Sequence, residues 1–187
     1  IVALIASAFT RINFFCVIHA LKDILFLAFS TASSEAALPG AMKRLEALGV
    51  PKPIVTFVMP TGYSFNLDGS TLYSSAGILF IAQLYGIQMP IEQQLLVMVT
   101  LMLSTKGIAG VPGAGIIVVA ATAAAFNLPT EGVAILLGVD RILDMIRTIC
   151  NVCGNCMATV VVACWEKDLT KADFYKNYRA FLEDRAA

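Results

Sequence analysis

Residues 66–70 read Asn66-Leu67-Asp68-Gly69-Ser70, and they interrupt an apolar segment that extends over residues 54–86. Turn-forming residues and a carboxylate do not fit the middle of a regular apolar helix. If the segment lies in a membrane, irregular backbone is tolerated only where it is buried in protein or lines a wet cavity. The interruption therefore predicts a discontinuous transmembrane helix whose break contributes to a site.

The composition supports a location in the membrane. Of the 187 residues, 58% are hydrophobic, and the mean hydropathy is +0.80, whereas a soluble domain is about 45–50% apolar. The formal net charge is zero and the basic residues form no dense patch, so we expect membrane lipid and no nucleic acid as partner. The five cysteines lie in apolar stretches, which does not favour a disulfide framework. Residues 1–5 lie within an apolar run, so we interpret the chain as a fragment.

Two pairs of apolar runs are each shorter than the roughly 20 residues that a helix needs to cross a bilayer. Small polar or glycine-rich tips join the members of each pair. The runs with their tips are residues 16–30, 30–35 and 36–48, and residues 95–105, 107–115 and 116–126. We predict that each pair is a re-entrant hairpin, which enters the membrane and leaves it on the same side.

Basic residues indicate the orientation. They cluster around the first hairpin and in the tail, whereas the connections at residues 86–94 and 127–132 have none. The positive-inside rule therefore places the tail in the cytoplasm, with the first hairpin entering from that side and the second from outside. Opposed hairpins around a broken helix are typical of secondary transporters. The predicted all-α membrane protein is divided into a preceding helix end and loop (1–13), a first re-entrant hairpin (14–50), a discontinuous transmembrane helix (51–88), a second re-entrant hairpin (89–128), a long last transmembrane helix (129–165) and a cytoplasmic tail (166–187).

The last predicted helix carries a row of polar residues that are three or four positions apart: Asp144, Arg147, Thr148, Asn151 and Asn155. This spacing puts them on one face of the helix. Each ionised side chain at the bilayer centre costs about 2.5–3.5 kcal/mol on insertion scales. The charges must therefore pair, face water or bind a ligand.

Two hypotheses account for these charges. In the first, Asp140 or Arg141 pairs with Asp144 and Arg147 in an internal ladder that only holds helices together. In the second, which we favour because intramembrane charge is usually functional, the face binds a ligand. The guanidinium of Arg147 can hold a carboxylate at two points, and Asp144 can bind an ammonium group. A ligand with one ammonium and two carboxylates is an acidic amino acid.

The two hairpin tips and the break suit small charged ligands. Ser33 and Ser34, and residues 111–115, end half-helices whose free N–H groups favour an anion, although each tip alone is typical of any tight turn. Asn66 and Asp68, with the carbonyl groups that the break frees, form an oxygen-rich group for a small cation or a proton. In a soluble protein the same residues would indicate a plain turn.

Other classes of function find less support. Cys150, Cys153 and Cys156 suggest a metal or iron–sulfur site, but this spacing drifts around a helix and no fourth ligand stands nearby, so we expect no metal and no cofactor. An enzyme would need a base beside the serines of a tip, and His19 lies on the preceding half-helix. We therefore expect a protein that is not an enzyme, and an anion channel stays open as an alternative.

Four motifs occur in order along the chain. They are STASSEAALP at residues 30–39, PTGYSFNLDGST at 60–71, KGIAGVPG at 106–113, and GVDRILDMIRT at 138–148, which is followed by Asn151 and Asn155. Together they resemble one family, the dicarboxylate/amino acid:cation symporters, over essentially the whole chain. The sequence of these motifs is most similar to that of the bacterial proton-coupled glutamate/aspartate members.

The resemblance implies a transport domain that moves like an elevator against a trimeric scaffold, with the two tips as inner and outer gates. It implies a multi-pass protein of the inner (plasma) membrane that forms a homotrimer through a scaffold missing from this chain. Together with the free N–H groups at the hairpin tips, the resemblance assigns substrate binding to Ser33, Ser34, Ser70, Val111, Gly115, Asp144, Arg147, Thr148 and Asn151. It assigns the coupling ion to Gly62, Asn66, Asp68, Asn151 and Asn155.

Departures from the family pattern bear on the coupling ion. Sodium-coupled relatives carry an Asp where this chain has Asn155, and a small or hydroxyl residue where it has Lys106 and Ile108. Losing a carboxylate and adding an ammonium weaken an oxygen cage for a hard cation, so the resemblance favours protons over sodium. Animal members keep a Glu where this chain has Ser74, which leaves the proton carrier open. Its candidates are Glu35, Asp68 and Asp144.

The resemblance also bears on the substrate. C4-dicarboxylate carriers of the family lack an acid at the position of Asp144, because succinate has no ammonium group to pair with it. A polar site rejects an analogue that lacks the matching group by roughly 10⁴–10⁵-fold. Glutamate or aspartate is therefore favoured over succinate, malate or fumarate. A C4-dicarboxylate symporter and a sodium-coupled glutamate symporter are the alternatives.

Overall fold

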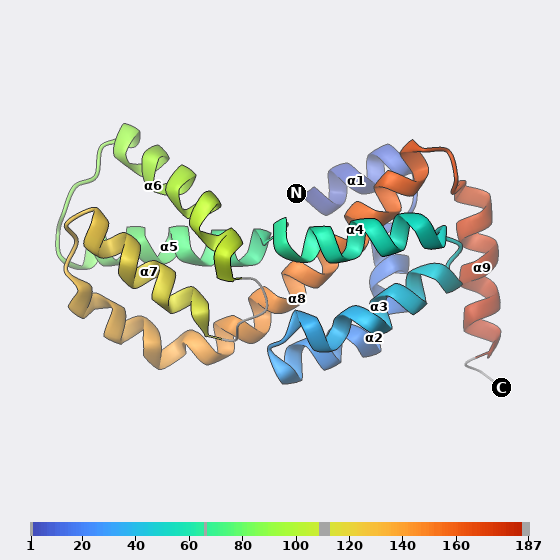
Figure 1. Cartoon of the computed structure of the whole chain (residues 1–187), viewed down its shortest axis with the longest axis horizontal. Helices are drawn as coiled ribbons and strands as arrows, with labels where there is room; N and C mark the ends of the chain where they lie inside the picture. Colours follow the sequence, from blue (N-terminus) through green and yellow to red (C-terminus); the bar gives the residue numbers. More distant parts are fainter. Residues whose placement is uncertain (1, 66, 109–112, 185–187) are drawn as a thin grey trace.

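The chain folds into helices, as its apolar runs predict. The computed structural model describes residues 2–65, 67–108 and 113–184, and none of these residues forms a β-strand. The elements are α1 (Val2–Thr10), α2 (Phe14–Thr31), α3 (Ser34–Ala47), α4 (Lys52–Phe65), α5 (Asp68–Leu84), α6 (Ile91–Ser104), the 3₁₀ turn η1 (Thr105–Ile108), α7 (Ala114–Ala125), the 3₁₀ turn η2 (Thr130–Gly132), α8 (Val133–Trp165) and α9 (Lys171–Asp184). The molecule is elongated (Figure 1).

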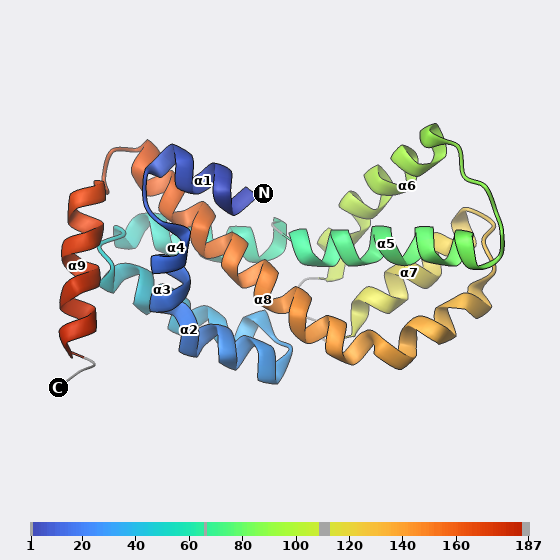
Figure 2. The same ribbon diagram turned by 180° about the vertical axis from the view of Figure 1, so that it is seen from behind.

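Helix α8 is the element on which the others pack. It extends through the length of the molecule (Figures 1 and 2) and contacts α1 to α5 and α7. One hydrophobic cluster joins its second half to α1 to α4 and α9, and another joins its first turns to α5, α6 and α7. The polar residues Asp140, Asp144 and Arg147 lie on α8 between the two clusters. The site is therefore positioned between two apolar cores.

The apolar segment is interrupted where the sequence predicts. Helix α4 ends at Phe65 and α5 begins at Asp68, so the break is shorter than the predicted five residues. The N–H group of Thr71 donates to the carbonyl of Leu67 at 2.9 Å, which continues the helical hydrogen bonding of α5 back to the residue before its first one. The break lies in the middle of the molecule, beside α8 (Figure 1).

The first predicted hairpin is formed by α2 and α3, which pack against each other. Its helices are longer at the tip than predicted, because only Ala32 and Ser33 separate them. The Thr31 hydroxyl donates to the Leu27 carbonyl at 2.7 Å and extends the end of α2. The Ser33 hydroxyl accepts from the N–H group of Ala36 at 3.4 Å and caps the start of α3. Two capped helices thus replace the six-residue tip.

The second predicted hairpin is formed by α6 and α7, which contact each other and α5. Helix α6 begins at Ile91, directly after Pro90, earlier than the predicted residue 95. Helix α7 begins at Ala114, inside the predicted tip. Residues 109–112, and with them Val111, lie outside the described residues. The inner ends of this hairpin approach the break from the opposite end of the molecule to the α2–α3 tip (Figure 1).

The two hairpins differ in the lengths of their helices. Within the described residues, Phe14–Thr31 and Thr130–Trp165 are long and apolar enough to cross a membrane, whereas Ile91–Ser104 and Ala114–Ala125 are shorter apolar helices. Helix α2 is therefore longer than the run that the sequence predicted. Its 18 residues reach the lower limit for a membrane crossing because Phe14, Phe15 and Thr31 extend the predicted run.

The tail packs against the base of the first hairpin, although its charge is typical of a solvated end. Phe174 of α9 is completely buried. The Tyr178 hydroxyl lies 2.9 Å from Nδ1 of His19, and the Arg44 guanidinium lies 4.3 Å from the centre of the Phe181 ring. Helix α9 is therefore a docked element of this unit.

We predict that Phe174→Ala releases α9 from the hairpin. Truncating a buried Phe costs about 3–5 kcal/mol, and Phe174 anchors α9 from its first turns. Hydrogen exchange measured by mass spectrometry should show faster exchange of the α9 amides in this variant. Leu182→Ala, on the same helix at a side chain that is 36% exposed, serves as the control and should leave the exchange rates unchanged. Equal protection of α9 in both variants would contradict the docking.

Candidate binding site

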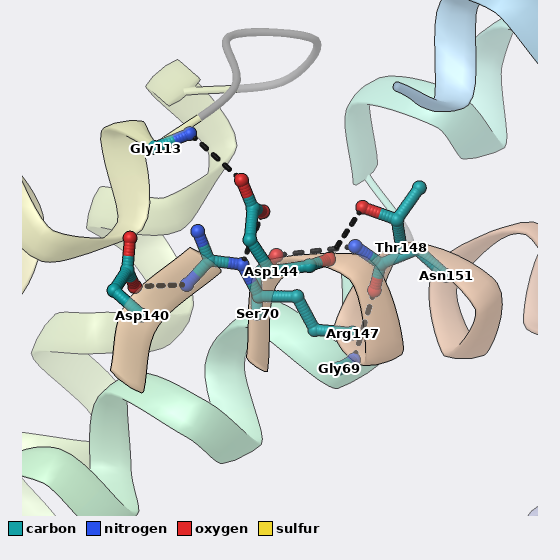
Figure 3. A network of polar contacts seen from close by, with 8 residues as sticks. All are labelled: Gly69, Ser70, Gly113, Asp140, Asp144, Arg147, Thr148 and Asn151. Atoms are coloured by element: carbon teal, nitrogen blue, oxygen red, sulfur yellow. Dashed lines mark hydrogen bonds and ion pairs between the residues drawn. The ribbon is translucent and has the colours of Figure 1, made fainter. Parts of the chain in front are cut away.

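A polar cavity lies where the first tip, the starts of α5 and α7, and the middle of α8 meet. Its empty volume, counting the part open to solvent, is about 390 Å³. The lining residues are Ala32, Ser33, Ser34, Leu67, Ser70, Gly115, Asp144, Arg147, Thr148 and Asn151. Figure 3 shows the polar contacts that organise its α8 wall.

The guanidinium of Arg147 lies between two carboxylates of the same helix. Its Nε donates to Oδ1 of Asp144 at 2.8 Å, and its Nη1 donates to Oδ1 of Asp140 at 3.4 Å (Figure 3). All three side chains are at most 10% exposed. The internal ion pairs that the sequence offered as one hypothesis are therefore present, with Asp140 rather than Arg141, which is exposed. Asp144 and Arg147 line the cavity as well, so the two hypotheses are compatible.

Asp144 also connects α8 to the second hairpin. Its second oxygen, Oδ2, accepts from the N–H group of Gly113 at 2.9 Å. Gly113 directly precedes α7, whose N-terminal end carries the positive end of the helix dipole. One carboxylate thus receives hydrogen bonds from its own helix and from the start of another.

Asn151 connects α8 to the break. Its Oδ1 accepts from the N–H group of Gly69 at 2.8 Å, and its Nδ2 donates to the Ser70 hydroxyl at 3.1 Å. The Thr148 hydroxyl donates to the carbonyl of Asp144 at 2.8 Å, within α8. The first turn of α5 is thereby held on the polar face of α8 at the edge of the cavity.

Close approach of the backbone forms two walls of the site. A Cβ atom on Gly69 would lie 2.6 Å from the carbonyl oxygen of Arg147, and one on Gly115 would lie 2.4 Å from Nη1 of Arg147. The Tyr73 ring covers the guanidinium, with its centre 4.6 Å from Cζ. The absence of a side chain at Gly115 thus leaves room for the guanidinium beside α7.

The structure brings most of the predicted substrate-binding residues together. Eight of them line the cavity, and the ninth, Val111, lies outside the described residues. The contacts of Gly113, Gly69 and Tyr73 were not predicted. The first two are backbone groups, which no residue pattern marks, and Tyr73 looks like any aromatic residue of an apolar helix.

The predicted ion-binding residues that the structure describes lie around the break and on the neighbouring part of α8. The Asn155 side chain lies against Gly62 of α4, and Asn151 holds the start of α5. Asp68 is exposed and lines a separate apolar cavity between α1 and α8. Asn66 lies outside the described residues. The cavity that Asp68 lines includes neither Asn151 nor Asn155 among its described residues.

Groups that could serve metal or acid–base chemistry lie elsewhere. His19 contacts Tyr178 of the tail helix and does not line the polar cavity. Cys150 is exposed whereas Cys156 is fully buried, so these two cysteines differ in their surroundings. Across the described ranges, no three His, Cys, Asp or Glu side chains are grouped so that they could hold a metal ion.

Comparison with known proteins gives consistent matches along the chain. A profile of the sodium:dicarboxylate symporter family matches residues 1–165. The proton/sodium-glutamate symport protein of Geobacillus stearothermophilus is 52% identical over 94% of this chain and 41% of its own length. The proton/glutamate-aspartate symporter of Escherichia coli K12 is 52% identical over 92% of this chain and 40% of its own length.

A second kind of relative matches less closely. The C4-dicarboxylate transport protein of Cupriavidus pinatubonensis is 43% identical over 95% of this chain and 41% of its own length. The chain therefore spans about two fifths of the length of the curated relatives that it matches.

We predict that Gly69→Ala destabilises the protein, because the new methyl group would meet the Arg147 carbonyl and push the start of α5 away from Asn151. Overpacking of this kind costs about 1–3 kcal/mol. The thermal midpoint of the purified protein should fall by several degrees. In the control Gly138→Ala, the added Cβ meets no atom within 4 Å, and alanine favours the helix by up to about 1 kcal/mol. A midpoint that falls equally in both variants would refute the close contact.

Proposed function

The chain belongs to the sodium:dicarboxylate symporter family, and on that premise we propose that it forms the substrate-carrying part of a transporter for glutamate or aspartate. The observation that carries the proposal is the polar cavity, in which Asp144 and Arg147 meet residues of both hairpins. The names of the matching relatives support the same class, since they are proton/sodium-glutamate and proton/glutamate-aspartate symporters.

Substrate recognition rests on complementary charges. Arg147 binds the side-chain carboxylate of the substrate, because a guanidinium can offer two parallel N–H groups to one carboxylate. Asp144 accepts the ammonium group. The remaining carboxylate lies near Ser33 and Ser34, where the start of α3 favours negative charge. Thr148, Asn151, Ser70 and Gly115 complete the walls of the cavity.

The choice between an amino acid and a C4-dicarboxylate depends on Asp144. Its carboxylate already pairs with Arg147 and accepts from Gly113. A substrate carboxylate placed against it without an ammonium group would add a second negative charge at low dielectric. The C4-dicarboxylate relatives are also less similar to this chain, at 43–45% identity, than the glutamate and glutamate-aspartate symporters, at 48–52%. A C4-dicarboxylate symporter is the alternative.

We further propose that the two hairpins are re-entrant and act as gates on opposite sides of the membrane. In support, they approach the break from opposite ends of the molecule (Figure 1), and both contribute to one cavity. The unit would move like an elevator against a scaffold that forms a homotrimer. The protein would lie in the inner (plasma) membrane, with α9 in the cytoplasm, because the basic residues gather around the first hairpin and the tail.

We propose protons as the coupling ion, with sodium as the alternative. The Lys106 ammonium donates a hydrogen bond to the carbonyl of Phe65, the last residue of α4. This carbonyl is one of the groups that the break frees, and a tethered ammonium there competes with a bound hard cation for the same oxygen. Asn155, as an amide beside Gly62, offers no negative charge to such a cation. Gly62, Asn66, Asp68, Asn151 and Asn155 remain the proposed residues around the ion path, with Glu35, Asp68 and Asp144 as proton carriers.

Replacing Asp144 by serine tests the substrate. In the full-length protein reconstituted into liposomes, Asp144→Ser should lower kcat/KM for glutamate at least about 10²-fold relative to succinate, because the ammonium group loses its partner. Asp140→Asn is the matched control: it also removes a partner of Arg147, but Asp140 does not line the cavity. This variant should lower uptake without changing the ratio of kcat/KM for glutamate to kcat/KM for succinate. Glutamate uptake that survives Asp144→Ser would refute the assigned role.

Replacing Lys106 by methionine tests the coupling. Without the ammonium at the Phe65 carbonyl, a sodium gradient should stimulate radiolabelled aspartate uptake at least several-fold more than in the wild type. Lys106→Arg keeps the charge and should behave like the wild type. Uptake by the wild type that requires a sodium gradient and ignores a proton gradient would overturn proton coupling.

A further inference from the structure

A second cavity, which combines two basic side chains with apolar ones, lies at the tail end of the molecule, between the α1–α2 connection and the start of α9. Arg11, Asn13, Phe15, Lys171 and Tyr175 line it, and its empty volume, counting the part open to solvent, is about 730 Å³. Its two cations come from positions 160 residues apart in the chain. Among the described residues, no carboxylate lines the cavity. The cavity is therefore suited to an anion.

Hydrogen bonds hold the walls of this cavity in place. The N–H group of Asn13 donates to the Tyr175 hydroxyl at 3.0 Å, which fastens the start of α2 to α9. The N–H group of Phe14 donates to the Ser7 hydroxyl at 3.0 Å. The Lys171 ammonium lies 5.9 Å from the centre of the Tyr175 ring, on the cavity side of α9.

Arg11 adopts an uncommon backbone conformation. Its φ of 56° lies in the left-handed region, which is unfavourable for a residue with a Cβ atom. The next residue, Ile12, is completely buried, so the connection is anchored directly beside Arg11. Arg11 itself is exposed at the cavity.

Aromatic side chains mark the level of this cavity in the membrane. Phe9 and Trp165 are 60% and 71% exposed, and their ring centres lie 6.1 Å apart. Phe15, which lines the cavity, is 70% exposed. Exposed aromatic residues beside basic ones, where apolar helices end, are typical of the boundary between hydrocarbon and headgroups. The start of α9 follows Trp165 closely, so the cavity opens at headgroup level.

We propose that this cavity binds the phosphate group of an anionic phospholipid. Arg11 holds the phosphate through its planar fork and Lys171 adds a second charge, while Phe15 lies against the upper part of an acyl chain. Anionic lipids give the cytoplasmic leaflet its negative surface potential. The inference rests on the membrane location and the cytoplasmic tail of the proposed function, and it assigns a lipid site that is separate from the substrate cavity.

Native mass spectrometry of the full-length protein tests the site. The purified protein is incubated with equal amounts of phosphatidylglycerol and phosphatidylcholine that have identical acyl chains. The wild type should retain phosphatidylglycerol in preference, and Arg11→Gln combined with Lys171→Gln should lower its retention at least threefold. Lys176→Gln, an exposed position of α9 that does not line this cavity, is the control and should retain it as the wild type does.

Several results would overturn the proposal. They are equal retention of both lipids by the wild type, undiminished retention by the double variant, an equal loss in the Lys176 control, and complete displacement of the lipid by millimolar inorganic phosphate, which would assign the cavity to free phosphate. If the double variant elutes as misfolded protein, the single variant Lys171→Gln replaces it and should lose part of the retention. The assay contains no substrate and no ion gradient, so its failure is distinct from a failure of the transport proposal.

Discussion

The buried charge of Arg147 is the constraint on which the rest of the structure depends. An isolated guanidinium in an apolar helix costs several kcal/mol, and Asp144, one turn away, and Asp140, two turns away, offset this cost. Two carboxylates around one cation leave an excess negative charge. The N–H group of Gly113, at the positive end of α7, stabilises part of it. Compensation of the charge thereby requires the second hairpin to lie against α8.

The two hairpins are attached to α8 in different ways. The starts of α7 and α5 are hydrogen-bonded to Asp144 and Asn151, which lie about two turns apart on α8. At the first tip, the hydrogen bonds of Thr31 and of the cap at Ser33 lie within the hairpin. Two walls of the cavity are thus fastened to α8, whereas the first tip is positioned by the apolar packing of α2 and α3. A ligand that bridges Ser33 and Arg147 would supply a connection that the packing does not.

Local patterns in the sequence predicted the parts of the fold that depend on neighbouring residues. The three- and four-residue spacing of Asp144, Arg147 and Asn151 placed them on one face of α8, and turn formers placed the break. The bond from Gly69 to Asn151 could not be predicted, because it joins residues 82 positions apart through a backbone group. The docking of α9 was missed for a related reason: its charges dominate the pattern, while one buried Phe174 supplies the anchor. The first tip is shorter than predicted because the hydroxyl groups of Thr31 and Ser33 extend the end of α2 and cap the start of α3.

Helix α8 is one uninterrupted helix of 33 residues, which corresponds to a length of about 50 Å. The hydrocarbon core of a bilayer is only about 30 Å thick, so α8 must tilt or extend beyond the core at one or both ends. Tilt and protrusion each change as the surrounding lipid becomes thicker or thinner. Because both apolar clusters are built on this one helix, a change in its tilt would carry the two hairpins with it as a single body. In a bilayer, hydrophobic mismatch of α8 would therefore act on both hairpins at once.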